Sequence, residues 1–398
     1  MHRRQISYWI CVLAVFAIGC LLRLRVWHSS DYLPGFDEQV YIDYIEQLGS
    51  KGLTEYPEIV RTYIVEVQKA EFVYLPPLRV AYTIPAWGLT KLFRLTSYEA
   101  LRLLSALASC AFTLAAFRFA LRWLSPKKAL AVLAMLACAP LQIHLAQFAF
   151  IDALAGLWAI LTVGCLWESL QQPRHRGWLI GAAGSFFGLC CTKQETAVFV
   201  GLFLCMALAL ARRAGFAETR WRHAIALALS GLLAAAVLTA LSGGLRPLAE
   251  AFTIYQDRAR TLPYSIITGD GPWHRYLLEY LLVNPLVFLL AVGFVFRGDL
   301  AGKRNVFLLV FVVITGAVMT SIPNGMNLRH TAMWDFPLAM FAVQSAGMLA
   351  AKCRARTVCA TAIIGLVCIS ELRQYNTIFP GLYDTDLRFM LRAVRILK

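Results

Sequence analysis

The chain has 398 residues, of which 59% are hydrophobic and 15% are charged, and its mean hydropathy is +0.62. This balance excludes a soluble globular protein and predicts a polytopic membrane protein. The 38 Lys and Arg residues exceed the 23 Asp and Glu. They do not indicate a nucleic-acid partner, because they stand in short clusters between apolar segments. The 11 cysteines show no metal-ligand spacing, and we assign them no disulfide.

The first apolar segment, residues 7–22, follows Arg3-Arg4 and lacks a convincing cleavage site, so we expect an uncleaved first span. The stretch Gly35-Phe36-Asp37-Glu38-Gln39-Val40-Tyr41 comes next. Beyond it, apolar residues recur at helical spacing, which predicts an amphipathic helix on the membrane surface. These residues are Tyr41, Tyr44, Ile45 and Leu48. Asp37 at the start of this helix is either a catalytic carboxylate or simply its N-cap.

The apolar run from Tyr74-Leu75-Pro76-Pro77-Leu78-Arg79 to about Phe93 decides the topology. It has about 16 residues, short of the roughly 20 that a span needs. If this run lies flat on the outer surface, all the basic clusters fall on one side, as the positive-inside rule requires. We therefore predict an interfacial helix there. The clusters are Arg3-Arg4, 118–128, 174–176, 212–222, 297–304 and 352–356.

The remaining apolar segments bring the total to about 11 spans, with a cytoplasmic N-terminus. They are 103–121, 129–148, 153–170, 178–192, 196–211, 224–242, 277–296, 305–322, 331–350 and 357–372. The polar elbow Thr192-Lys193-Gln194-Glu195-Thr196 joins two short spans and should lie below the membrane surface. We divide one continuous membrane domain into 1–242, with an outer loop at 28–102, and 243–398, with an outer loop at 243–276.

On this topology the outer face gathers several ionisable residues. An ionisable group such as Asp152, at the junction of two spans, indicates function because burial in the membrane is costly, although a helix cap is the alternative. Lys193 either snorkels to headgroups or forms a binding cluster with Glu195. The set is Asp37, Glu38, Glu71, Arg79, Asp152, Lys193, Glu195, Arg329 and His330.

Two residues near the tenth span have more than one interpretation. Arg329-His330 opens this span and either binds a ligand or anchors the helix at the interface. Asp335, one turn deeper, is expected to pair with a basic neighbour.

Six short motifs, in this order along the chain, resemble the GT-C superfamily of integral-membrane glycosyltransferases. The resemblance is to the branch of protein O-mannosyltransferases and lipid A aminoarabinose transferases. It covers most of residues 1–211 and weakens after that. The motifs are Phe36-Asp37-Glu38, Pro76-Pro77-Leu78, Ala100-Leu101-Arg102-Leu103-Leu104-Ser105, the Asp152 junction, Thr192-Lys193, and Asn327-Leu328-Arg329-His330 with Pro337 beyond.

The resemblance implies an all-α GT-C fold in a bacterial inner membrane, with the active site on the periplasmic face. Such enzymes move a sugar from a polyprenyl phosphate to a lipid, glycan or protein acceptor, and need no nucleic acid. Asp37 would be the general base, with Glu38 and Asp152 as further catalytic candidates. A single displacement with one base would invert the anomeric centre. The donor phosphate and substrate would be bound by Lys193, Glu195, Arg329, His330, Arg79 and Tyr41.

This sequence departs from the family before the proline motif, where relatives commonly have a His or an acidic-basic pair. Leu75 stands there, with Glu71 five residues before Pro76. If a divalent metal helps to bind the donor phosphate, as in some relatives, Asp37 and Glu71 would be its ligands. The second outer loop would recognise an acceptor or anchor the interface through Tyr255, Asp257, Arg258, Arg260, Tyr264, Trp273 and His274.

Two other classes of protein compete with the enzyme. A transporter or lipid flippase would show two repeated halves with broken helices at mid-membrane, and the sequence has no such repeat. A structural subunit with a degenerate site is the third class. Its site residues would be lost, whereas Asp37, Asp152, Lys193 and Arg329 are all present.

Overall fold

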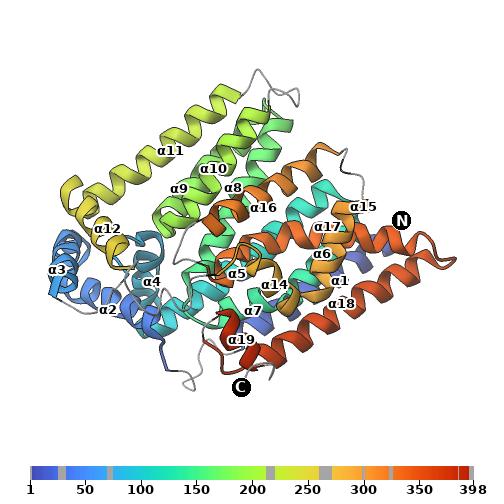
Figure 1. The fold of residues 1–398 in the computed structure, drawn as a ribbon, viewed down its shortest axis with the longest axis horizontal. Coiled ribbons are helices and arrows are strands. Elements are labelled where there is room, and N and C mark those ends of the chain that lie inside the picture. The colour runs from blue at the N-terminus through green and yellow to red at the C-terminus, as the bar shows by residue number, and fades with distance from the viewer. Residues whose placement is uncertain are drawn as a thin grey trace.

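The computed structural model describes residues 2–25, 33–69, 75–211, 220–259, 271–297, 300, 302–321, 326–383 and 385–393. Every regular element in this part of the chain is a helix (Figure 1), as the sequence predicted. The first five are α1 (His2–Leu24), α2 (Phe36–Lys51), the 3-10 turn η1 (Leu53–Glu55), α3 (Tyr56–Lys69) and α4 (Val80–Phe93).

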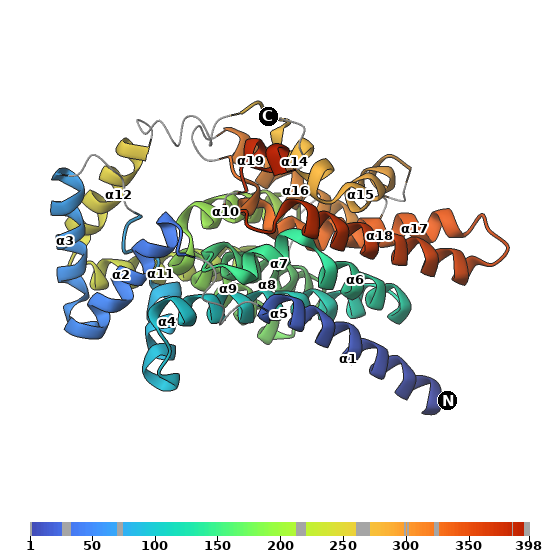
Figure 2. The ribbon, with the colours of Figure 1, turned by 90° about the horizontal axis from the view of Figure 1, so that it is seen from below.

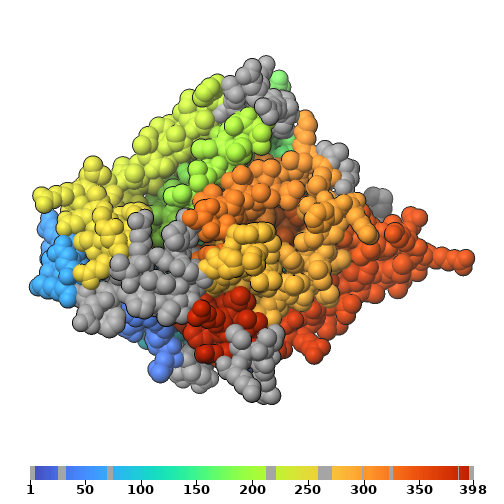
Figure 3. Space-filling view, viewed as in Figure 1, coloured from blue at the N-terminus to red at the C-terminus, as the bar shows by residue number. Residues whose placement is uncertain are grey.

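The helices that follow form the body of the molecule. Up to α12 they are α5 (Ser97–Trp123), α6 (Pro126–Cys138), α7 (Pro140–Gln147), α8 (Ile151–Gln171), α9 (Arg176–Thr192), α10 (Gln194–Ala211), α11 (Arg220–Leu241) and α12 (Leu245–Ala259). The last are α14 (Arg275–Val283), α15 (Pro285–Arg297), α16 (Lys303–Ser321), η2 (Leu328–Trp334), α17 (Asp335–Ala350), α18 (Arg356–Ile378) and α19 (Leu387–Ala393). The space-filling view in Figure 3 shows α10 to α12 and the C-terminal helices side by side on one face.

Seven of the described helices are long and apolar enough to cross a membrane: α1, α5, α8, α10, α11, α16 and α18. The pair α6 and α7 makes an eighth if it counts as one bent span. The prediction of about 11 spans was therefore too high by this criterion. The other three predicted spans correspond to α9, with 17 residues, and to two segments that are broken into shorter pieces, α14 with α15 and η2 with α17.

Proline explains two of the breaks. The predicted span 129–148 bends by 49° between α6 and α7, and α7 begins at Pro140. The predicted span 277–296 breaks at Asn284, and α15 begins at Pro285. A proline has no N–H to donate and its ring clashes with the preceding turn, so it starts a helix readily but interrupts one.

The predicted interfacial helix is α4. It has 14 residues, which is too short to span a bilayer. In Figure 2, α3 and α4 run across the direction of the long helices α17 and α18. Together with α2 and α12 they form one end of the molecule, opposite the N-terminus and the turn between α17 and α18 (Figure 1).

The predicted amphipathic helix is α2, and its apolar stripe is confirmed. Tyr41, Tyr44, Ile45 and Leu48 are all buried, and the helix contacts α4 and α5. It runs past Gly49 and ends at Gly52, whose φ of 84° suits glycine. Packing on α4 and α5 fixes the position of α2. It thereby also fixes the Asp37-Glu38 pair, which lies in the first turn of this helix.

Candidate functional site

Asp37 faces Arg329 from the first turn of α2. The N-cap of this helix is Gly35, so the alternative interpretation of Asp37 as an N-cap is wrong. Nη2 of Arg329 lies 2.8 Å from Oδ2 of Asp37, and both side chains are 24% exposed. Arg329 belongs to η2, where its backbone N–H donates to the side chain of Asn327. This is an ion pair that a ligand can still reach.

Glu38 has a different environment from its neighbour. It is fully buried; its Oε2 accepts the N–H of Gly35 at 2.7 Å, and its Oε1 accepts the N–H of Ala149 at 2.6 Å. Burial raises the pKa of Glu38 to about 7, although these two N–H donors oppose the rise. With both oxygens bound to backbone, Glu38 ties the start of α2 to the segment before α8. The geometry favours Asp37 over Glu38 as the reactive carboxylate.

The irregular segment between α7 and α8 is held from three sides. Besides Glu38, Arg102 donates from Nε to the carbonyl of Gln147 at 3.0 Å, and Ser105 donates to the carbonyl of Phe150 at 3.0 Å. A buried backbone that leaves a helix needs such partners. These bonds give the motif around Arg102 and Ser105 a role: it fixes the backbone from which Asp152 projects.

Asp152 lies in the first turn of α8 and pairs with Lys193. Its Oδ1 accepts from Nζ of Lys193, and its Oδ2 lies 3.8 Å from Nε of Arg329. Asp152 and Lys193 are buried, with 3% and 5% of their side chains exposed. The carboxylate of Asp152 therefore stands between two cations and holds them near each other.

Lys193 is the single residue between α9 and α10. Its backbone is extended, with φ −146° and ψ 99°, and its N–H still bonds to the carbonyl of Leu189. The predicted elbow is therefore confirmed as a break between two helices, although only Lys193, which we call the hinge, is outside them; its depth below the membrane surface stays a prediction. The amide of Gln194 donates to the carbonyl of Leu78 at 2.9 Å, which fastens the hinge to the start of α4.

The hinge also brings Glu195 to Arg79, the N-cap residue of α4. Nη2 of Arg79 lies 3.3 Å from Oε1 of Glu195. Arg79 is almost fully buried, and its Nε and Nη1 find no hydrogen-bond partner among the residues that the structure describes. Such donors favour a bound anion or water.

The structure thus brings six of the predicted residues into one row of alternating charge. Its order is Asp37, Arg329, Asp152, Lys193, Glu195 and Arg79. Three carboxylates balance three cations. His330 lies nearby, and burial and the charge of Lys193 hold its pKa well below its ordinary value. Tyr41 is buried, with its ring 5.4 Å from that of Tyr82.

The predicted metal site stays a prediction, because Glu71 lies outside the described residues. Asp37, its other expected ligand, is paired with Arg329. No group of three His, Cys, Asp or Glu side chains in the described ranges is placed to hold a metal ion. A guanidinium beside the carboxylate repels a divalent cation, so the described residues do not fit a metal.

Two aromatic residues of the site were not found from the sequence. The guanidinium of Arg329 lies over the ring of Phe150, 5.4 Å from its centroid, and the ring of Tyr383 packs on Phe150 at 5.1 Å. Phe150 stands two residues before Asp152 in the sequence, and this proximity could have indicated that it belongs to the site. Tyr383, in the tail after α18, carries no such signal. Tyr255 on α12 lies near Glu195 and Arg79, whose charges act on its hydroxyl.

Asp335 is not part of the row. Its direct partners are neutral: the amide of Gln142 donates to it at 2.9 Å and the hydroxyl of Tyr280 at 3.2 Å. The expectation of a basic partner in contact with Asp335 was therefore wrong. The charge of Arg23 acts on it, but the guanidinium of Arg23 bonds to Ser109 and to backbone carbonyls.

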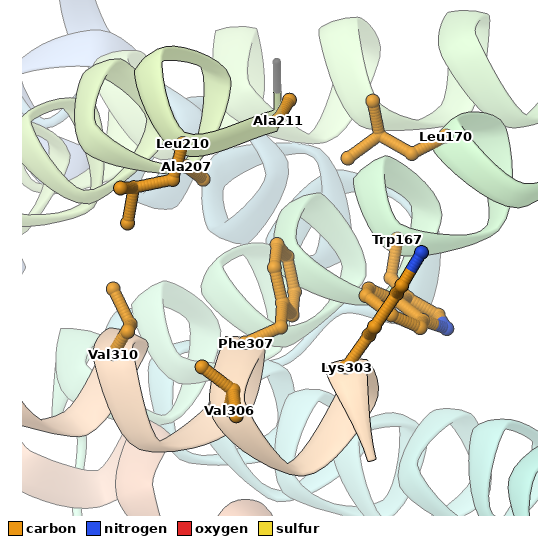
Figure 4. A pocket seen from close by; sticks show the side chains of 9 residues that line it. All are labelled: Trp167, Leu170, Ala207, Leu210, Ala211, Lys303, Val306, Phe307 and Val310. Atoms are coloured by element: carbon orange, nitrogen blue, oxygen red, sulfur yellow. The ribbon is translucent and has the colours of Figure 1, made fainter. Parts of the chain in front are cut away.

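An apolar pocket lies elsewhere in the helical body (Figure 4). Its lining comes from α8, α10 and α16, with Lys303 at the rim. Trp167 in this lining is four turns along α8 from Asp152, which places the pocket roughly 20 Å from the charged row. It is lined by Trp167, Leu170, Ala207, Leu210, Ala211, Lys303, Val306, Phe307 and Val310.

No family model matches this sequence, and no curated protein matches it. Solved structures do. ArnT from Cupriavidus metallidurans in the apo state matches 98% of this chain and 85% of its own, with a TM-score of 0.54 at 14% identity. The same protein bound to undecaprenyl phosphate matches 98% and 76%, with a TM-score of 0.51 at 15% identity.

A third similar structure comes from an archaeon. It is the oligosaccharyltransferase AglB from Archaeoglobus fulgidus, in complex with an inhibitory peptide and a dolichol-phosphate. It matches 93% of this chain and 55% of its own, with a TM-score of 0.53 at 12% identity. At these identities the likeness shows a shared fold over nearly the whole chain.

Proposed function

We propose that this polytopic membrane protein, which has the GT-C fold of ArnT and AglB, is a glycosyltransferase that uses a polyprenyl-phosphate sugar. The acceptor is a hydroxyl group, and the site lies at the outer face of the membrane. The observation that carries the proposal is the ion pair between Asp37 and Arg329. It puts a carboxylate that can take a proton beside a cation that can hold a phosphate.

The chemistry of the donor requires cations around its phosphate. Its reactive carbon is bonded to a phosphate oxygen, so the leaving group gains negative charge as that bond breaks. Arg329 offers a planar fork of N–H donors that suits phosphate oxygens, and Lys193 adds a second positive charge behind Asp152. In ArnT, a protein of this fold, undecaprenyl phosphate is bound. This supports a polyprenyl phosphate as the ligand here.

The proposed reaction is a single displacement. The acceptor oxygen attacks the anomeric carbon, and its proton passes to the carboxylate of Asp37. The bond between the anomeric carbon and the phosphate oxygen breaks, and its electron pair stays on the oxygen. Polyprenyl phosphate leaves, with its charge stabilised by Arg329 and Lys193. Attack from the face opposite the phosphate inverts the configuration of the sugar.

Asp152 is a positioning residue in this proposal. Its carboxylate holds Lys193 and faces Arg329, so it keeps two like charges close together that would otherwise repel each other. Glu38 positions Asp37 through its bonds to Gly35 and Ala149.

The test uses the purified full-length protein with a panel of polyprenyl-phosphate sugars, and measures release of polyprenyl phosphate. Asp37→Asn should lower the rate by about 10²–10⁴-fold, because an amide cannot take the proton. The matched control is Asp43→Asn, an exposed position on the same helix, which should leave the rate unchanged. A wild-type protein that moves the lipid across a bilayer without cleaving any donor would instead be a transporter.

A further inference from the structure

Tyr383 packs directly against the start of the helix that carries Asp37. A Cβ atom built on Gly35 would lie 2.1 Å from Cζ of Tyr383, far inside van der Waals contact. Only glycine leaves room for the ring at that position. The phenol therefore lies on the backbone two residues before Asp37, although Tyr383 comes from the segment between α18 and α19.

The same ring shares an aromatic platform with Arg329. Its centroid is 5.1 Å from that of Phe150 and 5.7 Å from that of Phe148. The guanidinium of Arg329 lies 5.4 Å from the centroid of the same Phe150 ring. Phe150 therefore contacts both the guanidinium of Arg329 and the ring of Tyr383, and the charge of Arg329 acts on the Tyr383 hydroxyl.

The hydroxyl of Tyr383 is buried and has no hydrogen-bond partner in the described part of the chain. A buried hydroxyl without a partner is costly, so its presence points to a ligand that supplies one. The charges that act on it are those of Asp37, Glu38 and Arg329. Burial, and then the two carboxylates, raise the pKa of Tyr383, so the group stays protonated and can donate.

We propose that the Tyr383 hydroxyl donates a hydrogen bond to a phosphate oxygen of the polyprenyl-phosphate donor that Arg329 binds. This rests on the proposed function. A phosphate fits better than a sugar hydroxyl, because the donating phenol and the guanidinium stand on one platform. The bond would strengthen as negative charge grows on the leaving phosphate, so Tyr383 would assist both binding and bond cleavage.

The first test is Tyr383→Phe, which keeps the ring on Gly35 and Phe150 and removes only the hydroxyl. Affinity for undecaprenyl phosphate should fall about tenfold, the usual worth of a hydrogen bond to a charged group. The single-turnover rate with a donor should fall as well. The matched control is Tyr8→Phe, since the hydroxyl of Tyr8 donates to the carbonyl of Pro126; it should match the wild type.

A second measurement separates contact with the phosphate from packing. Undecaprenol has the same chain without the phosphate, and its binding should be equal in the wild type and in Tyr383→Phe. Equal loss for both lipids would overturn the proposal, and so would a variant that binds undecaprenyl phosphate as the wild type does. A wild type that binds undecaprenyl phosphate but cleaves no donor would overturn the proposed function and leave the contact intact.

Discussion

The guanidinium of Arg329 lies 2.8 Å from the carboxylate of Asp37, across 292 positions of sequence. The pair joins η2 to the start of α2 at the end of the helical body. It also means that the proposed base is engaged by a cation in this structure. A phosphate that binds Arg329 competes with Asp37 for its N–H donors, so donor binding would free the carboxylate to accept a proton. In the proposed reaction the pair would therefore couple binding of the donor to activation of the acceptor.

The shape of the Arg329 side chain should matter as well as its charge. Arg329→Lys keeps the charge but loses the fork, so donor affinity and single-turnover rate should both fall by about tenfold or more. Arg329→Ala should lose more. Isothermal titration with undecaprenyl phosphate and single-turnover assays measure the two effects. If Arg329→Lys behaves as the wild type does, Arg329 only anchors η2 at the interface.

Lys193 should contribute to the same phosphate through charge alone. Its side chain is 5% exposed and paired with Asp152, so Lys193→Ala leaves that buried carboxylate with only the more distant Arg329, at 3.8 Å, as a cationic partner. We expect weaker donor binding together with a lower melting temperature, because an uncompensated buried charge is destabilising. The double variant Lys193→Ala with Asp152→Ala should recover the melting temperature but not the binding. Recovery of both would remove Lys193 from the phosphate site.

The raised pKa of Glu38 leads us to expect that the stability of the protein depends on pH. Burial raises its pKa to about 7 in the folded protein, above its ordinary value of 4.5. The folded state therefore binds more protons than the unfolded state between these values, and the free energy of unfolding should fall as the pH rises from 4.5 to 7. Glu38→Gln cannot titrate, so its melting temperature should change less between pH 5 and pH 7. An equal slope in both proteins would exclude Glu38 as the source.

The predicted topology can be tested at two exposed positions. Lys91→Cys on α4 should react with a membrane-impermeant thiol reagent added outside intact cells, because α4 is predicted to lie on the outer surface. The native Cys353, exposed in the turn between α17 and α18, should react only after permeabilisation. It thus serves as the internal control. The reverse pattern would place Asp37 on the cytoplasmic side.

Activity should not require a divalent metal. Asp37 and Asp152 each have a cationic partner, and a second cation at either carboxylate would be repelled. Transfer should therefore survive incubation with EDTA. Loss of activity with EDTA and recovery with Mg²⁺ or Mn²⁺ would contradict this expectation and support Glu71 as a ligand.

Features set by neighbouring residues were predictable from the sequence. The stripe on α2 and the hinge at Lys193 follow from apolar spacing and from a polar break between two short spans. Two of the three broken spans were predictable as well, since Pro140 and Pro285 stand inside them, but hydropathy alone hides a break. The predicted count of about 11 exceeds the seven or eight described helices that pass a test of length and apolarity, because hydropathy does not register where a helix begins or ends.

Features set by packing between distant segments were not predictable. Asp37 and Glu38 are adjacent, and a turn of 100° per residue sends them to different faces of α2. Which face meets Arg329 and which meets Ala149 depends on how α2 packs on α4 and α5. The contact of Tyr383 with Gly35 depends on the return of the tail after α18 to the start of α2. No local pattern in the sequence encodes such a return.

The hinge at Lys193 makes the length of α9 part of the geometry of the candidate site. A residue inserted into α9 would advance the chain by about 1.5 Å and rotate the residues that follow it by about 100°. Because one residue separates the two helices, no loop is present to absorb that change. The ammonium group would lose Asp152, and Glu195 would turn away from Arg79. We therefore expect insertions and deletions to be excluded from residues 176–195 in active homologues, even where substitutions are frequent.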